Sequence, residues 1–277
     1  MVTETISQPP RSLLEKQNIS VKSAMRQKIN VMHAVILRDI RSRYFNHGLG
    51  FLIVPLFPAS HLGLLLLVYS ITGRNPEFGD DARLFFATGL LPALTFSYVS
   101  RFMSISLLMN KSMMAFPVVK LLDIVLARAF LEFIGILIAA LIIVLVVVIF
   151  GSNPIPREPS EAVLAFTFTV MVALGYGIIA SVITSIFPSF SMFYALSMFV
   201  FYVASGAPIY LHSFPDVALY WCSWNPVFHS VEWMRSAYYL GYSTQYLDKT
   251  YLIANALGSV AIGLFMERTL RKSVLED

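Results

Sequence analysis

Six apolar runs, each close to the length that crosses a bilayer, divide this chain and limit what it can fold into. A helix needs roughly twenty apolar residues to span a hydrocarbon core. Of the 277 residues, 57% are hydrophobic and 13% are charged, whereas soluble domains carry about 25% charged residues. The sequence therefore predicts an all-α integral membrane protein with six transmembrane helices in residues 51–267. The predicted spans are 51–72, 84–108, 121–150, 162–187, 189–211 and 250–266.

The lysine and arginine residues predict the orientation of these spans. Fifteen of them lie before the first span, around the turn between the second and third spans, and after the last span; five lie on the opposite side. Because basic residues concentrate on the cytoplasmic side of membrane proteins, we expect both termini in the cytoplasm of a multi-pass protein. The net charge of +4 then indicates contact with lipid headgroups rather than with nucleic acid.

An amphipathic segment, "WNPVFHSVEWMRSAYYLGY" at 224–242, precedes the last span. A seventh span here would place the basic C-terminus outside, so we expect the segment on the outer side of the membrane. Asn225 and Pro226 form a favourable helix start, and Gly241 is a residue that can end a helix. Two interpretations of 206–242 stay open: a re-entrant helical pair, or an ordinary interfacial loop rich in aromatic residues.

A basic amphipathic helix is predicted at 22–45, after a flexible cytoplasmic segment at 1–21. Its apolar residues recur at helical spacing, namely Met25, Ile29, Met32, Ile36 and Ile40. Such a helix lies on the cytoplasmic leaflet, where it serves either as an anchor with a topology signal or as a lever against a cytoplasmic partner. At the other end, 268–277 is predicted to be a cytoplasmic tail.

Common catalytic motifs are missing from the sequence. It has no P-loop and no H-E-x-x-H metal motif, and no G-x-S-x-G nucleophile elbow. Its single cysteine, Cys222, excludes an intramolecular disulfide. Arg128 and Glu132 are four residues apart on one predicted helix and can form a structural ion pair. We therefore expect no catalytic residue, no bound metal and no cofactor held by this chain.

Several segments together resemble a known family. The segments are "LRDIRSRYFNHGLGFL" before the first span, "FFATGLLPALTFSYVSR" in the second, "NKSMMAFPVVKLLDIVLARAFLE" across the following turn, and "NPVFHSVEWMRSAYY" on the outer side. In this order and spacing they resemble the membrane subunits of type-2 ABC exporters, in particular the capsule-polysaccharide export permeases of Gram-negative bacteria. The likeness covers about residues 25–270.

The resemblance implies a transport subunit rather than an enzyme. It implies a homodimer in the bacterial inner membrane, bound to a separate P-loop ATPase dimer that carries ATP and Mg. The helix at 22–45 and the turn at 109–117 would contact that ATPase. The ATPase-coupling candidates are Arg26, Lys28, Arg38, Asp39, Asn110, Lys111, Met113 and Phe116.

The implied substrate is a lipid-linked polysaccharide. Aromatic rings can stack on sugars, and arginines can hold phosphate or carboxylate groups. Arg101 is the arginine placed well inside a span, which indicates either the pathway or snorkelling to the interface. The remaining pathway candidates are Tyr98, Phe102, Tyr202, Trp224, Trp233 and Arg235, with Tyr194 as a weaker one.

The outer loops at 73–83 and 151–161 are short, so separate periplasmic and outer-membrane export proteins would have to continue the path.

The alternatives within the same architecture are export of O-antigen, of another lipid-linked glycan, or of a smaller drug-like substrate. A membrane-embedded transferase and an ion channel are the alternatives from other classes; the first lacks a reactive constellation, and the second lacks a filter motif or a charged pore ring.

Overall fold

The computed structural model describes residues 21–43, 53–72, 76 and 78–276 of the chain. Within these residues all regular secondary structure is helical, so the predicted all-α membrane class is confirmed for them. Residues 1–20 of the flexible segment predicted at 1–21, and the junction at 44–52, lie outside the described residues. The helices are α1 (Val21–Arg43), α2 (Ile53–Thr72), α3 (Ala82–Ser104), α4 (Ser106–Met109), α5 (Lys111–Met114), α6 (Leu121–Ile149), α7 (Pro159–Ile186), α8 (Phe190–Val203), the 3-10 helix η3 (Leu211–Ser213), α9 (Asp216–Cys222), α10 (Pro226–Tyr238) and α11 (Lys249–Glu276).

Five described helices are long and apolar enough to cross a membrane: α2, α3, α6, α7 and α11. The segment predicted as the fifth span, 189–211, is different. Its helix α8 has 14 residues and ends at Val203, which corresponds to a rise of about 21 Å. Gly206 follows with φ +77°, a left-handed conformation that turns the chain away from the helix axis.

Two other boundaries differ in informative ways. α7 ends at Ile186 and α8 begins at Phe190, so the tight hairpin predicted around Pro188 is confirmed. The last helix was predicted to end at 266, yet α11 continues to Glu276. The extra turns are held on the bundle because Val274 is buried, with 2% of its surface exposed.

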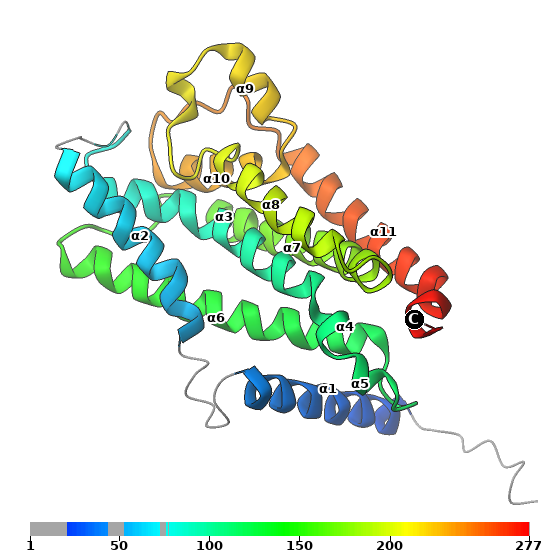
Figure 1. Cartoon of the computed structure of the whole chain (residues 1–277). Helices are drawn as coiled ribbons and strands as arrows, with labels where there is room; N and C mark the ends of the chain where they lie inside the picture. The colour runs from blue at the N-terminus through cyan, green and yellow to red at the C-terminus, as the bar shows by residue number, and fades with distance from the viewer. Residues whose placement is uncertain (1–20, 44–52, 73–75, 77, 277) are drawn as a thin grey trace, which may run out of the picture.

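Helix α3 is the central element of the bundle. It packs against α2, α6, α7, α8 and α10, and Figure 1 shows it between the α2–α6 side and the α7–α11 side. In the same view α1 lies along the foot of the bundle beside α6, while α9 and α10 lie at the opposite end. We call residues 206–248, which contain η3, α9 and α10, the cap, and we call the opposite end the α1 end.

The face of α1 that meets the bundle includes a charged residue. Val35 and Asp39 are buried, at 2% and 3% exposed. Of the predicted apolar stripe, Met25 and Ile29 are more than half exposed, and Met32, Ile36 and Ile40 are half-buried. The periodicity therefore identified the helix correctly, and an ion pair to α6 helps to fix which face packs on the bundle.

Helices α7 and α11 approach closely where glycines replace side chains. A Cβ at Gly175 would lie 2.7 Å from the backbone carbonyl carbon of Ser259, whereas a Cβ at Gly258 would meet nothing within 4 Å. Small residues let membrane helices pack backbone to backbone. The contact between these helices therefore depends on Gly175.

We expect Gly175→Ala to lower the thermal unfolding temperature of the detergent-solubilised protein, since overpacking costs about 1–3 kcal/mol. Gly258→Ala, which adds the same methyl group to α11 in open space, is the matched control and should leave the unfolding temperature nearly unchanged. Equal unfolding temperatures for the two variants would contradict the close contact.

Candidate functional site

Helix α10 of the cap is buried on almost every side, although its sequence is amphipathic. It packs against α3 and α7. Asn225 caps its start, accepting a hydrogen bond from the Val227 N–H at 2.9 Å and donating one to the Phe201 carbonyl of α8 at 2.8 Å. The predicted Asn cap is confirmed. The helix ends at Tyr238, three residues before Gly241, the residue expected to end it.

A buried carboxylate organises the middle of the cap. The Oε2 atom of Glu232 lies 2.6 Å from Nε2 of His212, and the Tyr242 hydroxyl donates to its Oε1 at 2.7 Å. Glu232 itself is 1% exposed. Burial raises the pKa of Tyr242 well above its usual value, so the hydroxyl stays protonated and keeps donating. These contacts hold η3, α10 and the following loop together.

Arg235 lies one helical turn further along α10 and is completely buried. Its Nη2 donates to the Ala207 carbonyl at 3.1 Å, and its guanidinium lies 4.0 Å from the centre of the Phe85 ring of α3. A Cβ at Gly89 would come within 2.7 Å of this Nη2, so the glycine provides the space that the arginine fills. Arg235, predicted to line a pathway, lies instead inside the cap.

Trp233, a second predicted pathway residue, is also interior, with 2% of its surface exposed. Its Nε1 donates to Oε2 of Glu161 at 2.5 Å, and the same oxygen accepts from Lys249 at 2.6 Å. The Lys249 ammonium lies 4.9 Å from the Trp233 ring centre. The indole thus joins α7, α10 and α11.

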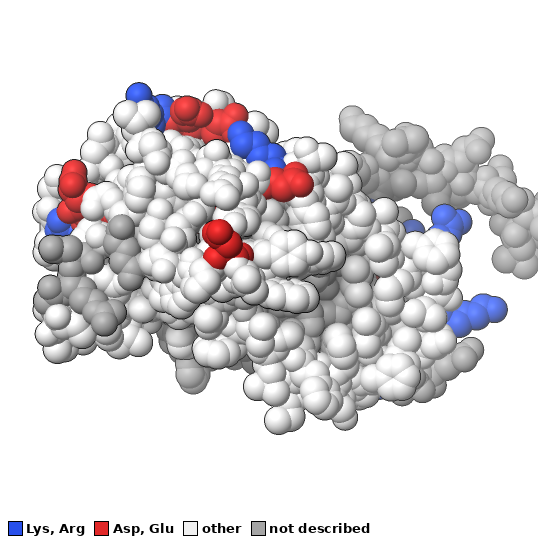
Figure 2. All heavy atoms as spheres, turned by 90° about the horizontal axis from the view of Figure 1, so that it is seen from above, with Lys and Arg blue, Asp and Glu red and all other residues white. Residues whose placement is uncertain are grey.

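Exposed aromatic rings of the cap gather on and after α9. Trp221 and Trp224 are 69% and 63% exposed, and Tyr220 packs edge-on against both. Trp224 is therefore the predicted cap aromatic that lies on the surface. Figure 2, which views this end from above, shows a largely uncharged face with several acidic and basic side chains next to one another along its edge.

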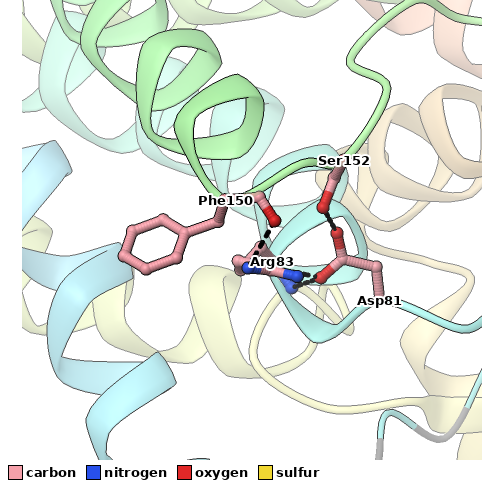
Figure 3. A network of polar contacts seen from close by, with 4 residues as sticks. All are labelled: Asp81, Arg83, Phe150 and Ser152. Atoms are coloured by element: carbon pink, nitrogen blue, oxygen red, sulfur yellow. Dashed lines mark hydrogen bonds and ion pairs between the residues drawn. The ribbon is translucent and has the colours of Figure 1, made fainter.

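A polar network next to the cap fastens two loops (Figure 3). Asp81 caps α3 and accepts from the backbone N–H and Nε of Arg83 at 2.9 and 2.8 Å. Arg83 also donates to the Phe150 carbonyl at 3.2 Å, and Ser152 donates to Asp81. The loop before α3 and the loop after α6 are thereby held in register.

The predicted pathway residues of the spans lie on α3 and α8, and a histidine of α2 joins them. The Tyr98 and Phe102 rings are stacked, with centroids 6.1 Å apart. His61 and the Tyr202 hydroxyl are 2.7 Å apart across α2 and α8. Arg101 is half-buried and donates to Ser104 of its own helix at 3.2 Å. We use the name polar strip for His61, Tyr98, Arg101, Phe102 and Tyr202.

At the α1 end, polar contacts attach α1 to the bundle. Arg38 donates to the Ser112 hydroxyl of α5 at 2.7 Å, and the Lys28 ammonium lies 3.5 Å from a carboxylate oxygen of Asp123 at the start of α6. Arg26 is exposed. Two of the predicted coupling residues on α1 therefore contact the turn before α6 or the first turn of α6.

A second buried charge cluster lies behind this surface. Arg128 of α6 forms ion pairs with Glu132 and, at 2.9 Å, with Asp39 of α1. Its guanidinium lies 4.9 Å from the centre of the Phe102 ring of α3. All three charged residues are at most 3% exposed. The predicted pair of Arg128 and Glu132 is present, and Asp39 extends it to a third charged group.

The turn between α3 and α6 has two short helices, α4 and α5, and its predicted coupling residues divide into two groups. Asn110 is buried and donates to the Ser106 carbonyl at 2.9 Å, and Met113 packs against the core. Lys111 is exposed, and Phe116 is 61% exposed. Asn110 and Met113 therefore help to fix the turn, whereas Lys111 and Phe116 form part of its exposed surface.

An open cavity of about 610 Å³ separates α1 from the end of this turn. Its wall combines apolar and charged side chains. The lining residues are Met25, Gln27, Lys28, Val31, Pro117, Val118, Lys120 and Asp123. Among the residues that the structure describes, no group of three or more His, Cys, Asp and Glu side chains could hold a metal ion.

Three long-range polar contacts were not predicted from the sequence. The His61–Tyr202 pair joins positions 141 residues apart, and the Asp39–Arg128 pair joins positions 89 residues apart, so no local pattern reveals them. His212 and Glu232 are separated by a turn-rich segment whose path the sequence does not specify. The one available signal was the presence of charged residues within otherwise apolar helices.

The long apolar helices and the buried cap define a multi-pass membrane protein. Residues 31–239 match the family described as ABC-2 type transporter, and the chain belongs to this family. It is 28% identical over 249 residues to the polysialic acid transport protein KpsM of Escherichia coli, covering 90% of this chain and 96% of that protein.

Two further relatives have similar coverage. The capsule polysaccharide export inner-membrane protein BexB of Haemophilus influenzae is 24% identical, covering 94% of this chain and 96% of the relative. The capsule polysaccharide export inner-membrane protein CtrC of Neisseria meningitidis is 25% identical, covering 92% of this chain and 96% of the relative. The similarity thus extends through both the bundle and the cap.

The contacts of His229 indicate how the stability of the cap depends on pH. Its Nε2 lies 2.7 Å from the Ser223 carbonyl and its Nδ1 accepts from the Asp248 N–H at 3.1 Å, an arrangement that needs the neutral ring. Burial lowers the pKa of His229 below 6.5, although the Ser223 carbonyl and the carboxylates of Asp248 and Glu232 oppose the shift. The unfolded state therefore binds more protons as the pH falls below about 7.

We expect the unfolding temperature to fall between about pH 7 and pH 5, and to fall less in His229→Gln, whose amide does not titrate. The measurement is thermal unfolding in detergent across this range, with the difference between the two proteins as the readout. Parallel curves for the wild-type protein and the variant would rule out His229 as the source.

Proposed function

We propose that this chain is the membrane subunit of an ATP-driven exporter that moves a lipid-linked capsular polysaccharide across the bacterial inner membrane. The observation that carries the proposal is the family match together with coverage of 96% of relatives that are named for polysialic acid transport or capsule polysaccharide export. Because the likeness extends over nearly the whole length, it supports the same role for this chain, that of a membrane subunit that works with a separate ATPase. Export of O-antigen or another lipid-linked glycan is the second candidate, since it needs the same architecture.

The proposed topology has six membrane-embedded helices with both termini in the cytoplasm. The short helix α8 supplies the fifth, and the cap is re-entrant on the outer side. Basic residues gathered at the α1 end support this orientation. The burial of α10 against α3 and α7 supports a cap that dips into the outer leaflet, because an ordinary surface loop buries few of its side chains.

ATP binding and hydrolysis are assigned to a separate P-loop ATPase, with Mg, and two copies of this chain form the exporter. The ATPase contacts α1 and the turn before α6, where Lys111 and Phe116 are exposed and where Lys28, Val118 and Lys120 help to line the open cavity. A surface that combines apolar and basic side chains suits a partner with an apolar groove and acidic groups. Periplasmic and outer-membrane export proteins continue the path beyond the cap.

The polar strip and the exposed Trp224 are the proposed substrate contacts. Tyrosine, histidine and tryptophan offer ring faces for stacking and polar atoms for sugar hydroxyls, and Arg101 offers a charge-assisted contact to phosphate or carboxylate groups. Trp233 and Arg235 keep the shape of the cap instead, since both are buried. The chain itself carries out no chemical step.

The proposal is tested by affinity purification of the tagged chain from its native host in mild detergent, with mass spectrometry of the retained proteins. A P-loop ATPase in equal amount with a permease dimer is expected, and a deletion strain should lose its surface polysaccharide on blots. Recovery of the chain alone in several detergents would overturn the proposal and return attention to a transferase or a channel.

Phe116→Asp should reduce the co-purified ATPase about tenfold or more, because it replaces an exposed apolar contact with a charge that must be desolvated. Leu240→Asp introduces the same charge at an exposed apolar position after α10 and is the matched control. Equal ATPase recovery with both variants would contradict docking at the turn.

Arg101→Gln should reduce export about tenfold or more with ATPase binding unchanged, if the guanidinium contacts an anionic group of the substrate. Arg101→Lys should retain part of the activity, because the charge is kept but the two-point geometry is lost. Export is measured as surface polysaccharide in a deletion strain that carries each variant. Full export by Arg101→Gln would remove this residue from the pathway.

A further inference from the structure

Arg128 connects three helices, and its two charged partners are nearly inaccessible. On α6 it pairs with Glu132, on α1 it pairs with Asp39 at 2.9 Å, and over α3 it stacks on Phe102 at 4.9 Å. No other contact of α1 described above is buried on both sides. Lys28 keeps 45% of its side chain exposed in its pair with Asp123, and Arg38 and Ser112 are both exposed.

The difference in burial decides which contact fixes α1. Exposed ion pairs contribute little, because water competes for both partners. Breaking a buried pair is far more damaging, since it leaves a charge without compensation. The position and roll of α1 on α6 therefore depend mainly on Asp39 and Arg128, which explains why α1 turns Asp39 inward and leaves Met25 and Ile29 exposed.

We propose that Arg128 is a positioning residue that makes α1, α6 and α3 move as one unit during transport. The proposal rests on the proposed function, in which the partner ATPase contacts α1 and the following turn. A displacement of α1 is passed to α6 by the ion pair and to α3 by the stacked Phe102 ring. Phe102 is stacked on Tyr98, so the displacement reaches the polar strip directly.

The chain offers variants that separate this link from the stability of α6. Asp39→Asn removes the carboxylate on α1 and leaves the Arg128–Glu132 pair within α6 intact. Glu132→Gln removes the pair within α6 and leaves the link to α1. Arg268→Gln changes an exposed arginine of α11 and is the matched control for loss of a charge.

The first measurement is amide hydrogen exchange of the full chain in lipid nanodiscs, followed over residues 25–41. We expect exchange in α1 to be about tenfold faster or more in Asp39→Asn, given the strength of a buried charged hydrogen bond. Glu132→Gln and Arg268→Gln should stay close to the wild-type rate. Unchanged exchange in Asp39→Asn would overturn the proposal.

The second measurement uses the complex with the co-purified ATPase and compares ATP hydrolysed with polysaccharide exported. Asp39→Asn should hydrolyse ATP at close to the wild-type rate while export falls about tenfold. The ratio of export to hydrolysis in Arg128→Lys should be intermediate. A lysine keeps the charge, but it lacks the planar guanidinium that contacts two carboxylates and stacks on an aromatic ring. If export falls only in proportion to ATP hydrolysis while amide exchange in α1 is faster, the role of Arg128 is purely structural. That result would overturn the proposed transmission of movement from α1 to α3.

The two proposals fail in different ways. If no ATPase binds the wild-type chain, the proposed function fails, while the exchange measurement still reports whether Arg128 fixes α1. If the ATPase binds and export proceeds, but Asp39→Asn alters neither exchange nor the ratio of export to hydrolysis, the exporter stands and the inference about Arg128 is wrong.

Discussion

Polar groups enclosed among membrane helices have no water to pair with, and the rest of this structure depends on how that constraint is met. An unpaired buried charge costs far more than an unpaired surface charge. In the described part of the chain, most of the buried charges lie in two clusters. One, around Glu232 and Arg235, lies in the cap, and the other, around Arg128, lies at the α1 end. Elsewhere in the described helices the buried polar side chains are mainly serine and threonine hydroxyls, and close contacts such as that at Gly175 bring the helix backbones together.

The apolar character of the helices is why so much of the fold could be predicted from the sequence. The ends of α6 and α7 lie within three residues of the predicted span ends, because long uninterrupted apolar runs admit one structure in a membrane. The helix cap at Asn225 could also be predicted from the sequence, since capping is a local interaction. Prediction was weaker for α8, which ends at Val203 before a glycine with positive φ turns the chain at 206, and for α11, whose last turns depend on tertiary burial of Val274.

The candidate site was less accessible to sequence reasoning because its contacts are long-range. Residue type indicated that Trp233 and Arg235 carry a function, but only the path of the chain shows that the Trp233 indole donates to Glu161 and that one nitrogen of Arg235 donates to the Ala207 carbonyl. Likewise Asp39 was expected to face a partner protein, whereas its carboxylate is turned toward Arg128. Spacing along a helix predicts neighbours on that helix and says nothing about which other helix supplies the partner.

Helix α3 contacts both charge clusters. Phe85 lies under Arg235 of the cap, and Phe102 lies under Arg128 at the α1 end. The two phenylalanines are 17 positions apart in the sequence, which on a helix corresponds to about 25 Å, close to the thickness of a bilayer core. Each guanidinium is therefore anchored on an aromatic face of the same helix, one near each end of the bundle. α3 is also the most enclosed of the described helices that are long and apolar enough to cross a membrane, so its neighbours hold it on most sides. Pro92 lies between the two anchors, and because a proline interrupts the helical hydrogen bonds, it is the surrounding helices rather than α3 alone that keep the two phenylalanines in place.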